Sequence, residues 1–270
     1  VDPKQGYDTV ELNVGENEGG FSMELWGSAV DVFSIDILSP SGEYVPTITG
    51  GLEGSREVSF LYEKTVLNIE YQLNEIHSGN PVYLLRFQDP APGIWRIRVY
   101  GRGDIAVEFH IWLPMGDFIS DNTYFIRPDP FTTVLQPGNA TVPMCVTAYD
   151  DANQGRYLEA SKGFTRMNRV VPDFAAPGVN VIAPTLTKEF RPFSGTGVAA
   201  AHTAGVAAML LEWGIVHGNI PRMNTLTIKI LLVRGAERSL WEEYPNRNWG
   251  YGILDKYFFS LNYILTKFDR

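Results

Sequence analysis

Hydrophobic and polar residues alternate with a period of two in the first part of the chain. The alternation is clearest at residues 33–37, 95–99 and 107–111. Short stretches rich in Gly, Pro, Ser and Asn separate these runs, at residues 39–42, 50–51, 77–81 and 89–93. A period of two is typical of half-buried strands, and closely spaced turns are typical of antiparallel sandwiches and jelly rolls. Residues 1–116 show no clear helical pattern, so they are predicted to form an all-β jelly roll or β-sandwich.

The pattern changes in the second part of the chain. Residues 145–149 and 179–182 are short apolar runs that predict strands. An Ala-rich segment begins near Val198 and predicts a long helix packed on most sides, with its large apolar residues at helical spacing: Val206, Met209, Leu210 and Trp213.

A further helix is expected from Asn224 or Thr225 to Gly235. Either first residue can accept a hydrogen bond from the free amides of the first turn, and glycine commonly ends a helix. Strands that alternate with helices indicate an α/β layer, so residues 117–270 are predicted to be an α/β domain.

Charge divides the chain at a similar point. Residues 1–116 contain 7 Lys and Arg against 17 Asp and Glu, whereas residues 117–270 contain 15 against 14. The whole chain has 270 residues and a formal net charge of -9, which favours two domains with a boundary near Gly116. An acidic chain without a basic surface is not expected to bind nucleic acid.

Three features bear on disulfides, membrane spans and cofactors, and they leave the compartment open. The single cysteine, Cys145, cannot form an internal disulfide and lies in an apolar strand, so an inert buried thiol is expected. The uncharged stretch 192–211 is diluted by Ser, Thr, His and Gly, so it predicts a buried helix and not a membrane span. No set of His, Cys and carboxylate residues has metal-ligand spacing, and no cofactor or metal is expected.

The richest chemistry is expected where the Ala-rich helix begins. The segment 193–205 reads Phe-Ser-Gly-Thr-Gly-Val-Ala-Ala-Ala-His-Thr-Ala-Gly. Glycines before a helix place free backbone N–H groups and the positive end of the helix dipole at one point, which suits the stabilisation of an oxyanion. The candidate active-site loop is therefore Ser194, Gly195, Thr196 and Gly197.

This segment resembles the nucleophile motif of subtilisin-like serine proteases, Gly-Thr-Ser-x-Ala-Ala-x-His-x-Ala-Gly. Gly197 stands at the nucleophile position, where the family has serine. The resemblance implies that His202 is the structural histidine of the helix. Other segments resemble family segments in the same order: residues 133–138 with 146–150, 161–165, 172–179 (which include Pro177 and Gly178) and 249–255.

The rest of the family's catalytic triad is not found in this chain. The family places its carboxylate in an Asp-(Ser/Thr)-Gly motif and its base in a His-Gly-Thr motif, both before the serine, and neither motif occurs here. The sequence His217-Gly218-Asn219 follows the helix and is interpreted as its end; residues 15–19, which superficially resemble the oxyanion asparagine segment, are interpreted as a turn. His77 and His110 are expected on the solvated surface. We therefore expect the chain to be the C-terminal part of a longer protein, tightly held to an N-terminal segment of the same parent.

Two hydroxyl side chains lie next to Gly197 in the sequence, those of Ser194 and Thr196. Ser194 and Thr196 are not expected to replace the missing serine, because adjacent side chains at a sharp turn point in different directions.

A jelly roll inserted before the serine helix resembles the arrangement in the clostridial Csp germination proteases and pseudoproteases. That resemblance implies the C-terminal half of a subtilisin-like domain, a role in germination signalling through protein partners, and a bacterial spore location.

Two alternatives to a natural pseudoprotease stay open. The chain could be part of an active endopeptidase whose serine was deliberately replaced, or the acidic sandwich could be a module that binds a cationic or protein partner.

Overall fold

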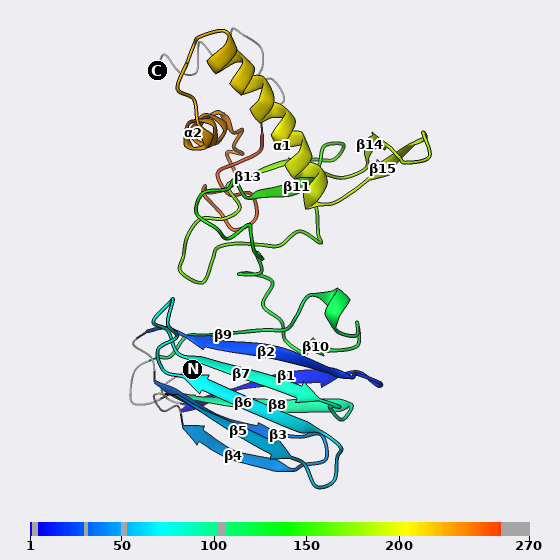
Figure 1. Ribbon diagram of the computed structural model, residues 1–270, viewed down its shortest axis with the longest axis vertical. Coiled ribbons are helices and arrows are strands. Elements are labelled where there is room, and N and C mark those ends of the chain that lie inside the picture. The colour runs from blue at the N-terminus through cyan, green and yellow to red at the C-terminus, as the bar shows by residue number, and fades with distance from the viewer. Residues whose placement is uncertain (2–4, 30–31, 50–52, 102–105, 255–270) are drawn as a thin grey trace. The chain divides into compact units, whose positions relative to one another are not determined.

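The computed structural model describes residues 1, 5–29, 32–49, 53–101 and 106–254, and its chain divides into two compact units (Figure 1). The first unit is Val1–Asp129 and the second is Pro130–Arg270. The predicted turn at residues 50–51 and the predicted match at Asp255 lie outside the described residues.

The first unit consists of two five-stranded antiparallel sheets. One sheet has the order β10 (Tyr124–Phe125), β1 (Tyr7–Val14), β8 (Gly93–Gly101), β3 (Phe33–Leu38) and β4 (Tyr44–Thr49). The other has the order β5 (Glu53–Ser59), β6 (Val66–Gln72), β7 (Val82–Gln88), β2 (Gly20–Gly27) and β9 (Phe109–Trp112). A short 3₁₀ helix, η1 (Gly116–Phe118), follows β9.

Side chains from both sheets share one hydrophobic core. Along β8 the residues Trp95, Ile97 and Val99 are buried while those between them face outward, so the predicted alternation is confirmed. Trp95 packs edge-on against Phe60 and Phe87, with ring centroids 5.1 Å apart in both pairs. The period-two pattern therefore positions the core because each strand contributes every second residue to it.

The outward face of the first sheet carries a compact polar cluster. Asp36 of β3 is fully buried although it lies on this face. Arg98 binds both of its carboxylate oxygens, at 2.8 and 2.7 Å, and the hydroxyls of Tyr44 and Tyr100 donate to Oδ2 at 3.0 and 2.7 Å. Burial, followed by the hydrogen bond to Asp36, raises the pKa of Tyr100 to about 12. The cluster joins three strands because β3 supplies Asp36, β4 supplies Tyr44, and β8 supplies both Arg98 and Tyr100.

The two units divide at Asp129, later than the boundary predicted near Gly116. The residues between these points belong to the first unit because β10 pairs with β1, with Phe125 opposite Leu12. The Glu18 carboxylate also accepts hydrogen bonds from Ser120 N and from Thr123 Oγ1, both at 2.9 Å. The net charge of a segment could not predict this boundary. The β10–β1 pairing and the hydrogen bonds to Glu18 join residues that are far apart in the sequence, and they do not depend on net charge.

The second unit contains a small sheet with two helices. The sheet has the order β12 (Gly155–Arg156), β11 (Val146–Asp150) and β13 (Phe174–Pro177), with β11 and β13 parallel. A separate hairpin is formed by β14 (Val181–Pro184) and β15 (Phe190–Phe193). The helical elements are α1 (Thr196–Leu211), continued by a π-helical turn η2 (Glu212–Val216), and α2 (Thr225–Gly235).

The strand predicted at residues 179–182 is displaced by two residues, because the strand observed there is Val181–Pro184. The strand that pairs with β11 is β13, Phe174–Pro177, and Val181 and Ile182 belong to the hairpin strand β14. The sequence Phe-Ala-Ala-Pro lacks the β-branched residues that usually indicate a strand. It forms one because Phe174 and Ala175 are completely buried in the small sheet.

The prediction for the second helix is confirmed. The Asn224 side chain accepts a hydrogen bond from Thr227 N at 3.0 Å, which caps the first turn of α2, and the helix ends at Gly235.

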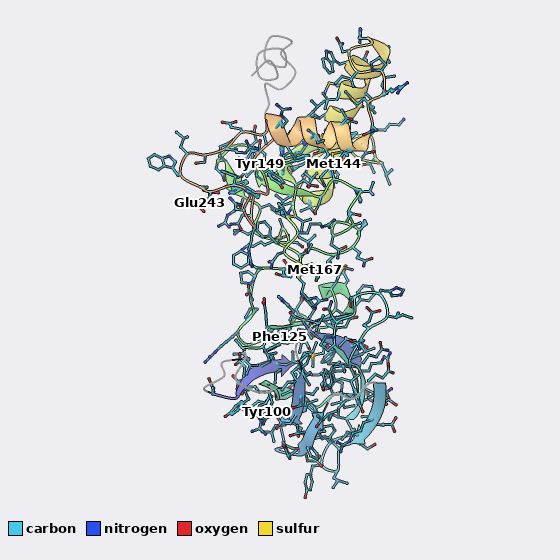
Figure 2. All side chains as sticks on the ribbon, turned by 90° about the vertical axis from the view of Figure 1, so that its left-hand side faces the viewer. Tyr100, Phe125, Met144, Tyr149, Met167 and Glu243 are labelled. Carbon is cyan, nitrogen blue, oxygen red and sulfur yellow. The ribbon has the colours of Figure 1, made fainter. Side chains whose placement is uncertain are left out.

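The prediction that α1 is packed on most sides is wrong. Only Ala199, Thr203 and Leu210 of its residues are buried, and Figure 2 shows many of its side chains extending away from the sheet. The segment Thr196–Val216 is long and apolar enough to cross a membrane by length and composition, a property that core helices of soluble proteins share.

The two faces of the small sheet are covered differently. Ala148, Phe174 and Ala176 pack with α1 and α2, whereas Tyr149 and Ala175 pack with Trp249 on the opposite side. A partly buried ion pair joins α2 to this sheet region: Lys229 Nζ lies 2.7 Å from the buried Asp173 Oδ1, and Asp173 Oδ2 accepts a hydrogen bond from Cys145 N at 2.8 Å.

Candidate functional site

The loop that enters α1 is held against the sheet by two glycines. Gly195 N donates to Gly178 O at 2.8 Å, and Gly178 N donates to Tyr149 O at 3.0 Å. A side-chain Cβ at Gly178 would lie 2.7 Å from Ala148 Cβ and 2.8 Å from Gly195 O, so only glycine allows this approach. Gly195 has φ of 144°, a conformation that favours glycine. The loop therefore keeps a fixed position relative to β11.

Gly197 lies in the first turn of α1 and is exposed. A Cβ built at this position meets no other atom within 4 Å. The surroundings would therefore accept a serine side chain without rearrangement. As it stands, the residue offers no hydroxyl, thiol or other nucleophile.

The neighbouring hydroxyls are placed differently. Ser194 Oγ accepts a hydrogen bond from Asn180 N at 2.9 Å, so this side chain fastens the loop to the segment after Gly178. Thr196 begins α1 and its side chain is exposed. The structure gives neither hydroxyl a histidine partner among the described residues, and a nucleophilic hydroxyl needs such a base.

The start of α1 has free hydrogen-bond donors. No side chain caps the helix, and the amides of Val198 and Ala199 both point to Gly195 O, at 3.1 and 3.3 Å. Within the described ranges, the amides of Thr196 and Gly197 have no acceptor. This end of the helix therefore retains N–H groups and a positive dipole that could stabilise an anion.

The structure places His202 beside the loop. Its Nδ1 lies 2.8 Å from Pro177 O, so Nδ1 carries the proton and donates, and α1 is tied to the segment that contains Pro177 and Gly178. The ring is exposed, not enclosed in a core. It serves to hold the loop and does not contact Gly197 through any hydrogen bond in the part of the chain that is described.

The remaining histidines lie elsewhere. His217 follows the last turn of η2, and Gly218 has φ of 77°, which confirms that this segment ends the helix. His110 stacks on Trp112 in β9, with centroids 5.4 Å apart. His77 lies in a turn and its amide donates to Glu75.

Cys145 is chemically quiet. Burial, followed by the nearby Asp173 carboxylate, raises the pKa of its thiol to about 11. The thiol stays protonated at neutral pH and is a poor nucleophile. Within the described ranges, no three His, Cys, Asp or Glu side chains are arranged to hold a metal ion.

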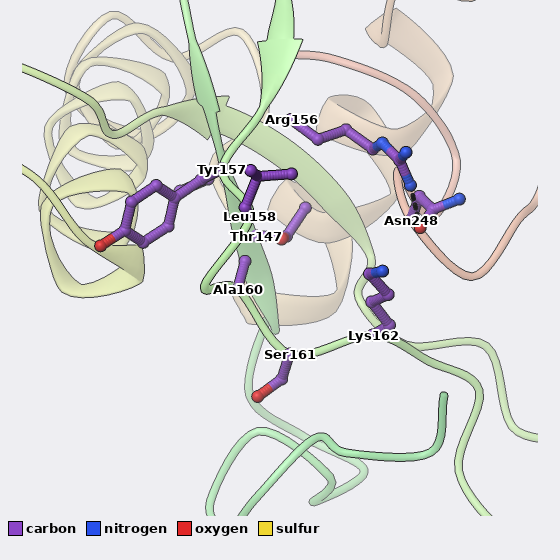
Figure 3. Close-up of a pocket in the computed structure, with 9 residues that line it drawn as sticks. Thr147, Arg156, Tyr157, Leu158, Ala160, Ser161, Lys162 and Asn248 are labelled. Carbon is purple, nitrogen blue, oxygen red and sulfur yellow. Dashed lines mark hydrogen bonds between the residues drawn. The ribbon is translucent and has the colours of Figure 1, made fainter. Parts of the chain in front are cut away.

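A small cavity of the second unit lies apart from the α1 loop (Figure 3). Its volume is about 20 Å³, and its lining includes Thr147 of β11, Arg156 of β12, Lys162 and Asn248. Arg156 donates to Asn248 Oδ1 at 2.7 Å. This cavity could not be predicted from the sequence, because its polar lining residues lie as far apart in the chain as Thr147 and Asn248 and form no motif.

Comparison with known proteins agrees with this arrangement. The family model described as Peptidase_S8: Subtilase family matches residues 126–252. The solved structure of the Clostridium perfringens CspB protease matches with a TM-score of 0.85 and 26% sequence identity, covering 92% of this chain and 52% of that chain. The chain thus spans about half the length of that relative.

Other comparisons add little. The structure of the prenylagaramide maturation protease PagA matches with a TM-score of 0.41 and 20% identity, covering 52% of this chain and 47% of that one, which is too weak for any argument. No curated protein sequence matches the chain.

Proposed function

Because residues 126–252 match the subtilase family model and the fold matches that of CspB, we propose that the chain is a pseudoprotease of the Csp group. One observation carries the proposal: the helix start that normally presents the nucleophile has Gly197 in its place. Loss of the nucleophile from such a triad lowers turnover on the order of a millionfold. The protein would then act by binding other proteins.

The sandwich supports the Csp assignment within this proposal. β1 pairs with β8 and β2 pairs with β7, so strands from opposite ends of the unit lie side by side, as in a jelly roll. We assign residues of the first unit to a jelly-roll insert and those of the second to the C-terminal half of the catalytic domain. The Csp resemblance then implies a role in germination signalling in the bacterial spore.

The exposed side of α1 supports a partner segment from the same parent protein. Ala204 is exposed near the middle of the helix, and Met209 and Leu211 are 46% and 37% exposed. Apolar helix surface of this kind is stabilised when a protein segment covers it. We assign this role to an N-terminal segment of the parent, in line with a match that spans 52% of CspB.

A probe for active serine hydrolases tests the lack of catalysis. The complete native protein is incubated with a fluorophosphonate, beside the variants Gly197→Ser and Ser194→Ala. No labelling of the native protein is expected. Labelling that disappears in Ser194→Ala would overturn the proposal, because another hydroxyl would then have replaced the missing one.

The second candidate function is an active endopeptidase whose serine was replaced deliberately. The open space around the Cβ direction of Gly197 favours it, since a serine fits there without rearrangement. The gene decides between the two: a serine codon at position 197 supports the endopeptidase, and a glycine codon supports the pseudoprotease.

Cysteine labelling tests the partner segment. In the complete protein, Ala204→Cys is expected to resist maleimide, whereas Ser55→Cys on exposed β5 should react readily. Equal reactivity at both positions would mean that no segment covers α1.

A further inference from the structure

The small cavity beside β11 has an excess of hydrogen-bond donors. Arg156 uses one of its nitrogens, Nη1, to reach Asn248 Oδ1, which leaves other guanidinium N–H groups available. Because Asn248 accepts this bond with Oδ1, its amide NH₂ group is not used in it and is a further donor. Thr147 contributes a hydroxyl from a residue that is only 5% exposed, and Lys162 adds an ammonium group. In Figure 3 the Arg156 side chain extends to Asn248 and the Lys162 side chain points toward this pair, whereas Thr147 lies apart from them and the Ser161 hydroxyl points away.

The positive charge of this cavity is not neutralised. Neither Arg156 nor Lys162 forms an ion pair with a carboxylate in the described part of the chain. The nearest acidic side chains along the sequence have other partners. Glu159 accepts from the Tyr157 hydroxyl at 2.6 Å, and Asp150 accepts from Ala152 N at 3.0 Å.

Backbone contacts fix the main chain at both cationic residues. Arg156 lies opposite Tyr149 in the β11–β12 pair. Lys162 N donates to Thr133 Oγ1 at 2.9 Å, and Thr133 N donates to Lys162 O at 3.0 Å. Lys162 Nζ also lies 5.8 Å from the centre of the Phe131 ring. The main-chain positions of the two donors are therefore fixed, and the hydrogen bond to Asn248 orients the exposed Arg156 side chain.

We propose that this cavity is an oxyanion-binding site, for a carboxylate or a phosphate group. The guanidinium of Arg156 matches the geometry of two oxygens on one carboxylate or phosphate, and Lys162 adds a second charge. The volume of about 20 Å³ has room for about one water-sized atom, such as one oxygen of the head group, so the rest of the ligand would lie outside the cavity. No residue of the loop 194–197 lines the cavity, so the site is independent of the proposed loss of catalysis.

Titration of the full chain with anions tests the site. Inorganic phosphate, acetate and a short peptide with a free C-terminal carboxylate are added separately at low chloride, and the Arg156 Nε–Hε signal is followed by NMR. Saturable binding of at least one anion is expected. Tighter binding of phosphate would identify a phosphate source, and tighter binding of acetate or the peptide would identify a carboxylate source.

Two variants and one control make the result specific. Arg156→Gln and Lys162→Gln are each expected to weaken binding by at least about tenfold, measured by calorimetry. Arg222→Gln removes an exposed charge from the same unit outside the cavity and should leave affinity unchanged. Circular dichroism confirms that each variant is folded. The proposal is overturned if no anion saturates the chain, or if Arg222→Gln weakens binding as much as the two cavity variants.

Discussion

The two units use apolar residues in different ways. In the first unit, two sheets enclose a common core, and Trp95, Ile97 and Val99 have no exposed surface. In the second unit, the longest helix buries three residues, and large apolar side chains such as Leu186, Leu240 and Trp241 are almost fully exposed. An apolar side chain contributes to stability only where other elements enclose it. The first unit supplies both sides of its core, whereas the second leaves α1 covered on one side.

A pair of matched tryptophan variants tests this comparison most strongly. Trp95→Ala removes a fully buried ring and its hydrogen bond from Nε1 to Ala91 O, so the first unit should lose about 3–5 kcal/mol of unfolding free energy. Trp241→Ala removes a ring that is 94% exposed and should change stability by less than about 0.5 kcal/mol. Urea unfolding followed by circular dichroism measures both. Similar losses in the two variants would contradict the contrast.

The ion pair of the second unit gives the next largest effect. Asp173→Asn keeps the shape of the side chain but leaves the mostly buried Lys229 ammonium without its counter-charge. The free energy of unfolding should fall by about 3 kcal/mol. Glu189→Gln breaks the exposed pair with Arg191 and serves as the control, with an expected change below about 0.5 kcal/mol. Thermal and urea unfolding should rank the two variants in this order.

A glycine pair tests the loop at the start of α1. Gly178→Ala should destabilise the second unit by about 1–3 kcal/mol, because the added methyl would meet Ala148 and Gly195 O. Gly197→Ala adds the same methyl into open space within a helix and should be neutral or stabilising by up to about 1 kcal/mol. If both substitutions destabilise equally, the close approach at Gly178 is not what fixes the loop.

The smallest effect on folding comes from titration of Cys145. Its pKa rises from 9.0 to about 11 in the folded chain, so the linked stability is complete below pH 9 and is lost as the pH rises through 11. At pH 8 the effect on stability is well below about 1 kcal/mol, but the thiolate fraction falls about 100-fold relative to the unfolded chain. Alkylation by iodoacetamide with and without urea measures the ratio. Equal rates would show that burial does not protect the thiol.

Much of the fold follows from local pattern. The alternation in β8 and β3, the Asn224 cap and the helix end at His217 and Gly218 could be predicted because each depends on residues close together in sequence. The unit boundary and β13 could not, since they depend on pairings with β1 and β11 across long separations. The exposure of α1 was missed because an Ala-rich sequence is compatible with a helix buried on any number of sides.

In the candidate site, too, the features that depend on neighbouring residues could be predicted and those that depend on distant residues could not. The motif located Gly197, and the structure explains its neighbours: Ser194 is bonded to Asn180, and His202 to Pro177. The donor cavity at Arg156 and Lys162 had no signal in the sequence. That its two cations have no carboxylate partner among the described residues can be seen only in the structure, where Glu159 and Asp150 bind other groups.

The open space at Gly197 bears on how this position changes over generations. Since a side chain there touches nothing, packing neither penalises a mutation to serine nor rewards the change back. Apart from the difference in helix propensity between glycine and serine, folding therefore sets no barrier to exchange at this position. In the proposed pseudoprotease, regaining the hydroxyl would therefore need a single substitution and no compensating change in the loop.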